Sequence, residues 1–544
     1  MIERQVETSL SGNRGSQEMP GDLMSIRDAA EWASQHTGRY VTESNINYLI
    51  QYGRVPKISG NSVTMVSRND LLHYYNSSIG GRESRWGKRV GQDLNWSLAF
   101  DDLKESERTK HVHRLHPYKG KFIPQLVQYF LDDHINDFKK QVYFRPGDIV
   151  LDPFCGSGTL LVQANELGMH AIGVDVSEFN TMISNVKIAD HDFVGLSEQI
   201  NQITANLASF VTESGISHLE ITLETELSWF NNANFPAPDY RAKVVSGEID
   251  EVSFGRAKEE EFRHTYQRLV KEAGVEMAGK SGGSFIDRWF SAQIKRELEL
   301  VRDIIVQVQN SDTRNVLTII LSRTMRSCRA TTHFDLATLK EPVTSAYYCH
   351  KHGKICMPLL SILGWWRRYS LDTVERLLKF QRLRTNTYQY CLTGDSRTID
   401  VVAELERIYP ALASLVRKQR IKGIFSSPPY VGLIDYHEQH AYAYAMFGIT
   451  KRDQLEIGRM SKGQGEEAKR DYVKSISEVL VNCERFLMDD YDVFLVANDK
   501  FNLYEDIADR SEMRIIDQFK RPVLNRTERD KGAYSETIFH MKAK

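Results

Sequence analysis

This 544-residue chain has few cysteines, no long hydrophobic run and no excess of charge of one sign. Six cysteines in a chain of this length do not supply a disulfide framework, which favours a reducing compartment. No apolar run approaches the roughly 20 residues that span a bilayer, and residues 1–4 do not begin a signal-peptide core. We therefore expect a cytoplasmic protein that has no membrane partner.

The near-neutral charge restricts the kind of nucleic-acid binding that is open to this chain. The 70 lysines and arginines are balanced by 72 aspartates and glutamates, so a nucleic acid would need a local basic face. With 41% hydrophobic and 26% charged residues, the composition is that of a globular protein. The length predicts two or three domains.

A strand, a glycine-containing loop, a helix and a second strand follow one another in residues 147–175. The loop has neither the Gly-x-Gly-x-x-Gly spacing of a dinucleotide fold nor the Gly-Lys-Ser/Thr end of a phosphate-binding loop. The order of elements is nevertheless that of the mononucleotide-binding half of a doubly wound sheet.

The loop suits a ligand that carries an amino-acid group and a ribose. Asp152 can pair with an ammonium group, backbone amides can take a carboxylate, and Asp175 at the end of the second strand can accept ribose hydroxyls. S-adenosyl-L-methionine has all three groups. We predict cofactor contacts from Asp152, Phe154, Gly156, Ser157, Gly158, Thr159 and Asp175.

The residues Ser427, Pro428, Pro429 and Tyr430 follow a second apolar strand end. An exocyclic amino group on a base is a poor nucleophile, because its lone pair is delocalised into the ring. The Ser427 hydroxyl and the Pro428 carbonyl can accept its two N–H bonds, and Tyr430 offers a face for an extruded base. An ordinary rigid turn explains such a string equally well in isolation, but the cofactor-type loop upstream favours a base-amine pocket.

Together the two loops resemble those of the amino-methylating DNA methyltransferases, which act on cytosine N4 or adenine N6. Residues 116–124 resemble the family's segment that closes over the methionine end of the cofactor, and residues 392–396 resemble its later acidic loop. The resemblance covers residues 110–190 and 390–544, about half of the chain. It implies further cofactor contacts from Lys121, Phe122 and Asp395.

The resemblance implies a site-specific, S-adenosyl-L-methionine-dependent methyltransferase acting on double-stranded DNA in the bacterial or archaeal nucleoid. Serine before Pro-Pro-Tyr is more often seen in this family with cytosine N4, so we expect that product, with adenine N6 as the alternative. A cognate restriction endonuclease is expected by family habit. A DNA-binding regulator that only senses the cofactor is the alternative of another class. His437, Glu438 or water is expected to take up the released proton, and Cys155 is expected to be a packing residue.

The predicted fold class is α/β. We expect a doubly wound, Rossmann-like methyltransferase sheet with a large, mostly helical insertion and a small N-terminal winged helix-turn-helix domain. The expected boundaries are a flexible lead at residues 1–20, the winged domain at 21–76, a linker at 77–100, the cofactor half of the core at 101–190, the insertion at 191–388 and the catalytic half at 389–544.

The N-terminal pattern resembles helix-turn-helix domains of the excisionase and mercury-regulator type. Helices are expected at residues 26–35 and 46–52, followed by two short strands. A small protein-docking module fits the same pattern. The resemblance implies major-groove contacts from Ser44, Asn45, Asn47 and Tyr48, and phosphate contacts from Arg54, Lys57 and Arg68.

The insertion corresponds in position to the family's target-recognition element. Its arginines suit phosphates or guanine edges: Arg323, Arg326, Arg329, Arg367, Arg368, Arg382 and Arg384. It also holds a group of metal-ligand types: Cys328, His333, Cys349, His350, His352 and Cys356. Their spacing matches no standard zinc finger, and buried cysteines with phosphate-facing histidines explain the same residues, so we assign no metal ligand.

Overall fold

The computed structural model describes residues 22–37, 41–51, 55–60, 63–76, 86, 89–91, 93–100, 103, 105–118, 120–136, 138–275, 283–333, 339–524 and 533–544. The expected lead at residues 1–20 and much of the expected linker lie outside these ranges. The chain divides into two compact units, residues 1–85 with 237–248, and residues 86–236 with 249–544. No helix in the described ranges is long and apolar enough to cross a membrane.

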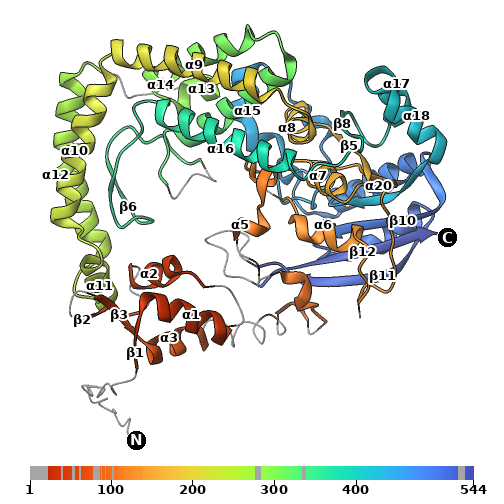
Figure 1. Ribbon diagram of the computed structural model, residues 1–544, viewed down its shortest axis with the longest axis horizontal. Coiled ribbons are helices and arrows are strands. Elements are labelled where there is room, and N and C mark those ends of the chain that lie inside the picture. Colours follow the sequence, from red (N-terminus) through yellow and green to blue (C-terminus); the bar gives the residue numbers. More distant parts are fainter. Residues whose placement is uncertain are drawn as a thin grey trace, which may run out of the picture. The chain divides into compact units, whose positions relative to one another are not determined.

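The first unit combines a small antiparallel sheet with short helices (Figure 1). The strand order is β1-β3-β2, and the core between sheet and helices includes Ala29, Ala33, Ile46 and Leu71. Both helices expected from the sequence are present, as is the pair of strands after them. The elements are β1 Leu23–Ser25, α1 Ile26–Thr37, α2 Glu43–Gln51, β2 Ile58–Gly60, β3 Val63–Ser67, α3 Arg68–Tyr75 and α11 Asp239–Ser246.

The second unit is built on a seven-stranded sheet in the order β11-β12-β10-β9-β4-β5-β8. The pairs β10–β9, β9–β4, β4–β5 and β5–β8 are parallel, and β12 is antiparallel to both of its neighbours. The last strand of the chain is therefore reversed relative to both of its neighbours. The strands are β4 Ile149–Asp152, β5 His170–Asp175, β8 Gln389–Thr393, β9 Ile421–Ser426, β10 Leu487–Ala497, β11 Met513–Pro522 and β12 Ser535–Ala543.

The strands β4 and β9 lie side by side at the point where the chain changes direction across the sheet. From β4 the chain proceeds outward to β5 and β8, and then returns to the other side of β4 as β9. Loops at the carboxyl ends of such a pair diverge and leave a crevice for a ligand. Gly423 lets β9 approach its other neighbour, β10, because a Cβ there would lie 2.2 Å from the Asp492 carbonyl oxygen.

Helices cover the sheet. A helical pattern runs through residues 401–419, but these residues form two helices, because Pro410 has no N–H to donate and disfavours a helical conformation at Tyr409, where φ is −142°. The helices nearest the sheet are α6 Pro124–Leu131, α7 Thr159–Glu166, α8 Glu178–Ile188, α17 Val401–Ile408, α18 Pro410–Gln419, α19 Ala441–Phe447, α20 Glu466–Glu484 and α21 Tyr504–Arg510, with the short α5 Glu105–Arg108 preceding them.

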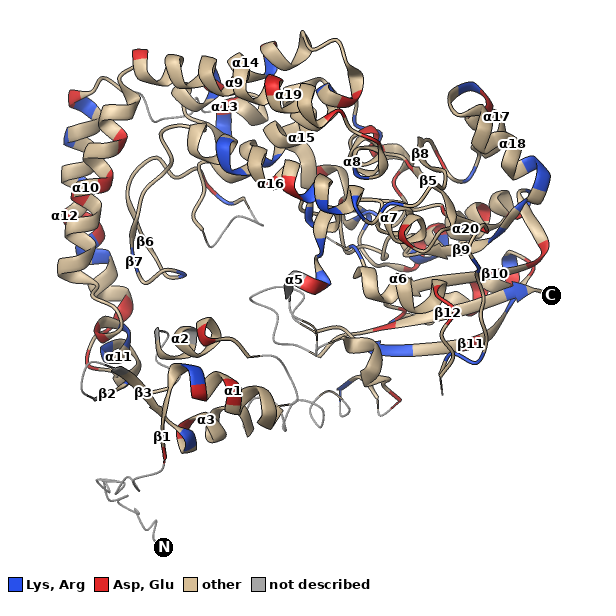
Figure 2. Ribbon diagram, in the orientation of Figure 1, with Lys and Arg blue, Asp and Glu red and all other residues tan. Residues whose placement is uncertain are grey.

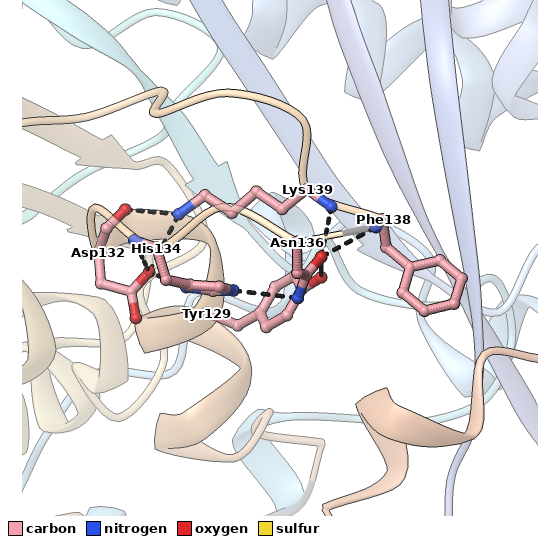
Figure 3. Close-up of polar contacts among 6 residues, drawn as sticks. All are labelled: Tyr129, Asp132, His134, Asn136, Phe138 and Lys139. Carbon is pink, nitrogen blue, oxygen red and sulfur yellow. Dashed lines mark hydrogen bonds and ion pairs between the residues drawn. The ribbon is translucent and has the colours of Figure 1, made fainter.

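A polar network around the buried Lys139 ammonium fixes the turn that follows α6 (Figure 3). The Lys139 ammonium is fully buried and donates to the backbone carbonyl of Asp132 and, at 3.0 Å, to its carboxylate. Burial lowers the pKa of Lys139, which the Asp132 carboxylate opposes. The Asn136 side-chain oxygen accepts from the Phe138 and Lys139 amides at 2.9 and 2.8 Å. The network thereby ties residues 134–139 to the end of α6.

The insertion between β5 and β8 is mostly helical, as predicted. The long helices α10 and α12 pack against each other, and a two-stranded hairpin, β6–β7, lies beside them. Its elements are α9 Phe193–Glu213, α10 Ile216–Asn234, α12 Glu251–Glu272, α13 Phe285–Trp289, α14 Ala292–Val306, α15 Ser311–Cys328, β6 Tyr347–Cys349, β7 Lys354–Cys356 and α16 Leu363–Gln381.

The insertion is less basic than its arginines suggest. Figure 2 shows acids and bases interspersed along α12, where Arg263 pairs with Glu259 and Arg268 with Glu272. Two of the arginines expected to face phosphates are buried. Arg323 pairs with Asp372 inside the α15–α16 contact, and the Arg329 guanidinium lies over the Tyr442 ring at 5.4 Å. The expectation of phosphate contacts is wrong for these two arginines, because their side chains are buried and contact other residues of the protein.

Candidate active site

A cavity of about 840 Å³, open solvent included, lies at the carboxyl ends of β4, β5 and β9. Most of the residues predicted for the cofactor line it, so the fold gathers segments 121–122, 152–159, 175, 395 and 427–429 around one space. Gly158, Pro428 and Tyr430 are not among its lining residues. The predicted residues that line the cavity are Lys121, Phe122, Asp152, Phe154, Gly156, Ser157, Thr159, Asp175, Asp395, Ser427 and Pro429.

Asp152 is a buried carboxyl group that joins the two loops of the site. The Ser426 hydroxyl, at the end of β9, donates to Asp152 Oδ1 at 2.5 Å, and the Phe154 amide donates to the same oxygen at 3.1 Å. Burial raises the pKa of Asp152 to about 7, and the two hydrogen bonds only partly oppose this. A buried carboxyl with an elevated pKa is a site that gains from a cationic ligand group.

Asp175 shapes the glycine loop from the end of β5. Its carboxylate accepts from the Gly156 amide at 2.8 Å, from the Ser177 amide at 2.8 Å and from the Asn180 side chain at 3.1 Å. Burial still raises its pKa to about 6. The ribose contact predicted for Asp175 therefore has to share the carboxylate with three protein donors.

Aromatic rings close one side of the cavity, and their packing was not predicted. Tyr118 covers Gly156, whose φ is +52° and whose missing Cβ would lie 3.0 Å from the tyrosine ring. Tyr118 in turn stacks on Tyr436 and His440, with ring centroids 6.1 and 6.0 Å apart. The loop after Tyr430 therefore folds back over the cofactor cavity.

Contacts from α19 hold this covering loop in place. The Tyr444 hydroxyl lies 2.5 Å from Ser177 Oγ and 2.6 Å from His437 Nδ1. His437 and Glu456 both line the cavity, and burial raises the pKa of Glu456 to about 7. Glu438, by contrast, is 60% exposed and paired with Lys451, so a predicted role in removing a proton is better placed on His437 or on the unpredicted Glu456.

Ser427 is oriented by the neighbouring strand. Its hydroxyl donates to the Val496 carbonyl oxygen of β10 at 3.0 Å. Because the hydroxyl proton is used there, the oxygen lone pairs are left to accept from a ligand. This is the polarity that the predicted contact with a base amino group requires.

Tyr430 faces a neighbouring space. It lines a second cavity together with Leu433, Asn498 and Tyr534, and its hydroxyl donates to Glu536 Oε1 of β12 at 2.9 Å. Glu536 also pairs with Arg521 at 3.2 Å. The two ends of the loop formed by residues 427–430 thus line different cavities, the first one at Ser427 and this second one at Tyr430.

Three further predicted residues already have protein partners. Asp395 pairs with Arg397 at 2.7 Å, and the Lys121 ammonium donates to the His113 carbonyl at 2.6 Å, with burial lowering its pKa to about 8. The Phe122 ring packs edge-on against Phe425 of β9. Their contacts with a cofactor stay predictions. Cys155 is buried against Gly173, where a Cβ would lie 2.4 Å from its sulfur, and this fits the expected packing role.

The cavity lies where the strand order of a doubly wound sheet reverses, and this arrangement is typical of α/β proteins that bind nucleotide-containing cofactors. Residues 48–185 match the family model described as DNA methylase. The chain is 42% identical over 525 residues to the Type II methyltransferase M.MjaII of Methanocaldococcus jannaschii, covering 96% of this chain and 97% of that protein.

Shorter matches agree with this assignment. The chain is 25% identical over 181 residues to the Type II methyltransferase M.BsoBI of Geobacillus stearothermophilus, covering 30% of this chain and 33% of that protein. It is 31% identical over 134 residues to M.MvaI of Kocuria varians, covering 24% and 27%. The chain belongs to the amino-methylating DNA methyltransferases of restriction-modification systems, a family that uses S-adenosyl-L-methionine.

Gly156→Ala is expected to weaken S-adenosyl-L-methionine binding at least tenfold, about 1.4 kcal/mol. The added methyl meets the Tyr118 ring at 3.0 Å and sits on a left-handed backbone, so the loop has to shift away from the cavity. Isothermal titration calorimetry measures the change. Gly147→Ala is the matched control, because Gly147 also has a positive φ, +91°, but has no atom within 4 Å of the added methyl. Equal affinity in both variants would show that Tyr118 does not fix the loop.

Proposed function

We propose that the protein methylates the N4 amino group of cytosine in a specific sequence of double-stranded DNA. The observation that carries amino-group methylation is the Ser427 hydroxyl, which lines the cofactor cavity and donates to the Val496 carbonyl, so that its oxygen can accept from a base amino group. The choice of cytosine rests on the serine that precedes Pro-Pro-Tyr. The helical insertion is proposed to read the target sequence. A cognate endonuclease that cuts the same sequence is the expected partner.

The reaction needs the base outside the duplex, where the amino nitrogen can approach a methyl donor. Extrusion costs a few kcal/mol of pairing and stacking, which a stacking surface and a fitted pocket offset. Tyr430 is proposed to supply the surface from the second cavity, while the amino group reaches toward Ser427 in the first. S-adenosyl-L-methionine supplies the methyl group when it is bound.

Acceptors at Ser427 and at the Pro428 carbonyl direct the two N–H bonds and free the nitrogen lone pair. The residues hold the nucleophile in line, so most of the rate gain is orientation. Once the nitrogen carries four bonds its surplus proton leaves readily, and Glu456 and His437 are the cavity residues proposed to accept it. No covalent intermediate with the protein is required.

Tyr430→Ala is expected to lower methyl transfer to DNA by about 5- to 150-fold, because base–aromatic stacking is worth about 1–3 kcal/mol. Tyr430→Phe keeps the ring and loses only the hydrogen bond to Glu536, so it should retain most of the activity. Ser427→Ala should lose transfer while its cofactor affinity is unchanged. A tritiated-methyl assay with full-length protein measures all three.

The identity of the methylated nucleoside decides between the two bases. Digestion of methylated DNA followed by mass spectrometry should give N4-methylcytosine. N6-methyladenine would overturn the cytosine assignment and leave the amino-pocket roles standing. Full activity of Tyr430→Ala would remove the stacking role.

The affinity for S-adenosyl-L-methionine is expected to fall as the pH decreases below about 7. Asp152 has to be ionised to pair with the ligand ammonium, and with a pKa of about 7 it becomes protonated below that pH, which costs up to about tenfold per pH unit. Calorimetry between pH 5.5 and 7.5 tests this. Asp152→Asn should bind weakly and lose this dependence. Glu456→Gln removes another acid of the cavity and is the control, which should keep the loss of affinity below pH 7. If Asp152→Asn still lost affinity below pH 7, the pH dependence would belong to a different group.

We further propose that the N-terminal unit adds phosphate contacts to DNA binding. Ser44 and Asn47 on α2 are exposed, as are Lys57 and Arg68 beside the small sheet. The Asn45 side-chain oxygen instead accepts from the Thr42 amide and hydroxyl, which assigns it to the start of α2. Tyr48 and Arg54, expected to join these contacts, have side chains outside the described residues.

Lys57→Ala/Arg68→Ala is expected to weaken DNA binding and to reduce the slope of log affinity against log salt by about 2, one counterion for each lost phosphate contact. Fluorescence anisotropy across a salt series measures the slope. Arg407→Ala/Arg417→Ala, on exposed side chains of α17 and α18, is the matched control. An unchanged slope in the first variant would favour a protein-docking role for the unit.

A further inference from the structure

Four side chains of metal-ligand type converge in the part of the chain that connects α15 to α16. None of them lines the cofactor cavity. His333 comes from the segment after α15, Cys349 from the end of β6, His352 from the turn and Cys356 from the end of β7. One ligand atom from each lies within 4.8 Å of the corresponding atoms of the other three. The sequence spacing gave no reason to assign these residues to a metal.

We propose that His333, Cys349, His352 and Cys356 bind one Zn²⁺ ion in a tetrahedral structural site. Bond lengths of about 2.1 Å to nitrogen and about 2.3 Å to sulfur place tetrahedral ligands roughly 3.3–3.8 Å from one another. His352 Nδ1 lies 3.4 Å from Cys356 Sγ, and His333 Nδ1 lies 3.8 Å from Cys349 Sγ. These two separations are those of a zinc site.

The hairpin turn is built to bring its three ligands together. The His352 and Gly353 amides both donate to the Cys349 carbonyl, at 3.0 and 2.7 Å, and Gly353 adopts a φ of +63°. This folds the chain back directly after the first cysteine, so that Cys356 returns to it on β7. The His333 amide donates to the Tyr347 hydroxyl at 3.2 Å, which fixes the backbone of that ligand. The same hydroxyl lies 2.9 Å from His333 Nδ1, and zinc binding through Nδ1 would replace that contact.

The face of the hairpin that carries the two cysteines has little apolar packing. Its local cluster consists of Tyr347, Cys349 and Cys356, with Val343 packed against it, whereas Tyr348 and Ile355 on the other face are buried. A metal ion would supply the stabilisation that this small cluster does not. Side-chain clamps hold the hairpin to its neighbours: Asn231 of α10 bonds both backbone groups of Ile355 at 3.0 Å.

The site is structural, because four protein ligands leave no open position on the ion. The nearby Cys328 and His350 have the same side-chain chemistry but belong outside it. Cys328 is buried at the end of α15, and His350 Nδ1 lies 3.5 Å from Glu251 Oε1. A disulfide between Cys349 and Cys356 is the rival, although the strand register sets Cys349 opposite Lys354 and both thiols are free.

Zinc content of the full-length protein tests the proposal. Protein purified under reducing conditions without chelator is expected to carry about one zinc per chain, as measured by elemental mass spectrometry. His352→Gln and Cys356→Ser should each lose most of it. His350→Gln and Cys328→Ser are the matched controls, one on the same turn and one a buried thiol of the same insertion, and both should keep it.

Replacement of zinc by Co²⁺ gives a second readout that does not depend on activity. A tetrahedral site with two thiolates should show intense visible d–d absorption and a sulfur-to-cobalt band, and both should be lost in His352→Gln. His352 is exposed, so this variant is expected to stay folded, which circular dichroism checks. Native protein that stays below about a tenth of a zinc per chain after incubation with Zn²⁺ would overturn the proposal. A protein mass lower by two hydrogens would also overturn it, because it would show a disulfide between Cys349 and Cys356.

Discussion

The side-by-side pairing of β4 and β9 is the constraint on which the rest of this molecule depends. The Ser426 hydroxyl reaches Asp152 at 2.5 Å across this pair, although 274 residues separate them in the chain. A cofactor loop and a base loop that start from adjacent parallel strands diverge at the same edge of the sheet, and the crevice between them becomes the site. On the proposed roles of the two loops, the register of these two strands sets the separation between cofactor and base.

Burial gives the cavity its chemical character. Asp152, Asp175 and Glu456 are acids with pKa values raised by desolvation, so the cavity without a ligand disfavours their charged forms. A ligand with a sulfonium and an ammonium group would oppose this effect by adding positive charge beside these carboxyl groups. Folding thus places carboxyl groups where their ionised forms are poorly solvated, and a bound cationic ligand would stabilise those ionised forms. Selectivity for such a ligand follows from the same burial.

Prediction from the sequence succeeded where the signal was local. Apolar runs followed by glycine or proline loops located β4, β5 and β9 together with the loops that end them. The stacking of Tyr118 on Tyr436 was not predictable, because no local pattern reports which aromatic residues meet across 318 positions. Glu456 was missed because only the tertiary fold brings it into the cavity, whereas the sequence showed the ligand types of the His333–Cys356 quartet but not their geometry. The break at Pro410 was different: its signal is local, and the helical periodicity on both sides outweighed it.

The insertion is not an independent appendage, because it is anchored to the elements that carry the site. His116, at the start of the segment over the cofactor cavity, bonds through Nε2 to Ser322 of α15 at 3.0 Å, and Arg376 of α16 donates to the His111 carbonyl. The helix α15 also packs on α8, whose Ser184 donates to the Gly156 carbonyl of the glycine loop. Packed side chains therefore join the insertion to the cofactor loop. On the proposal that the insertion reads the target sequence, we expect this connection to make discrimination arise in the rate of methyl transfer as well as in affinity.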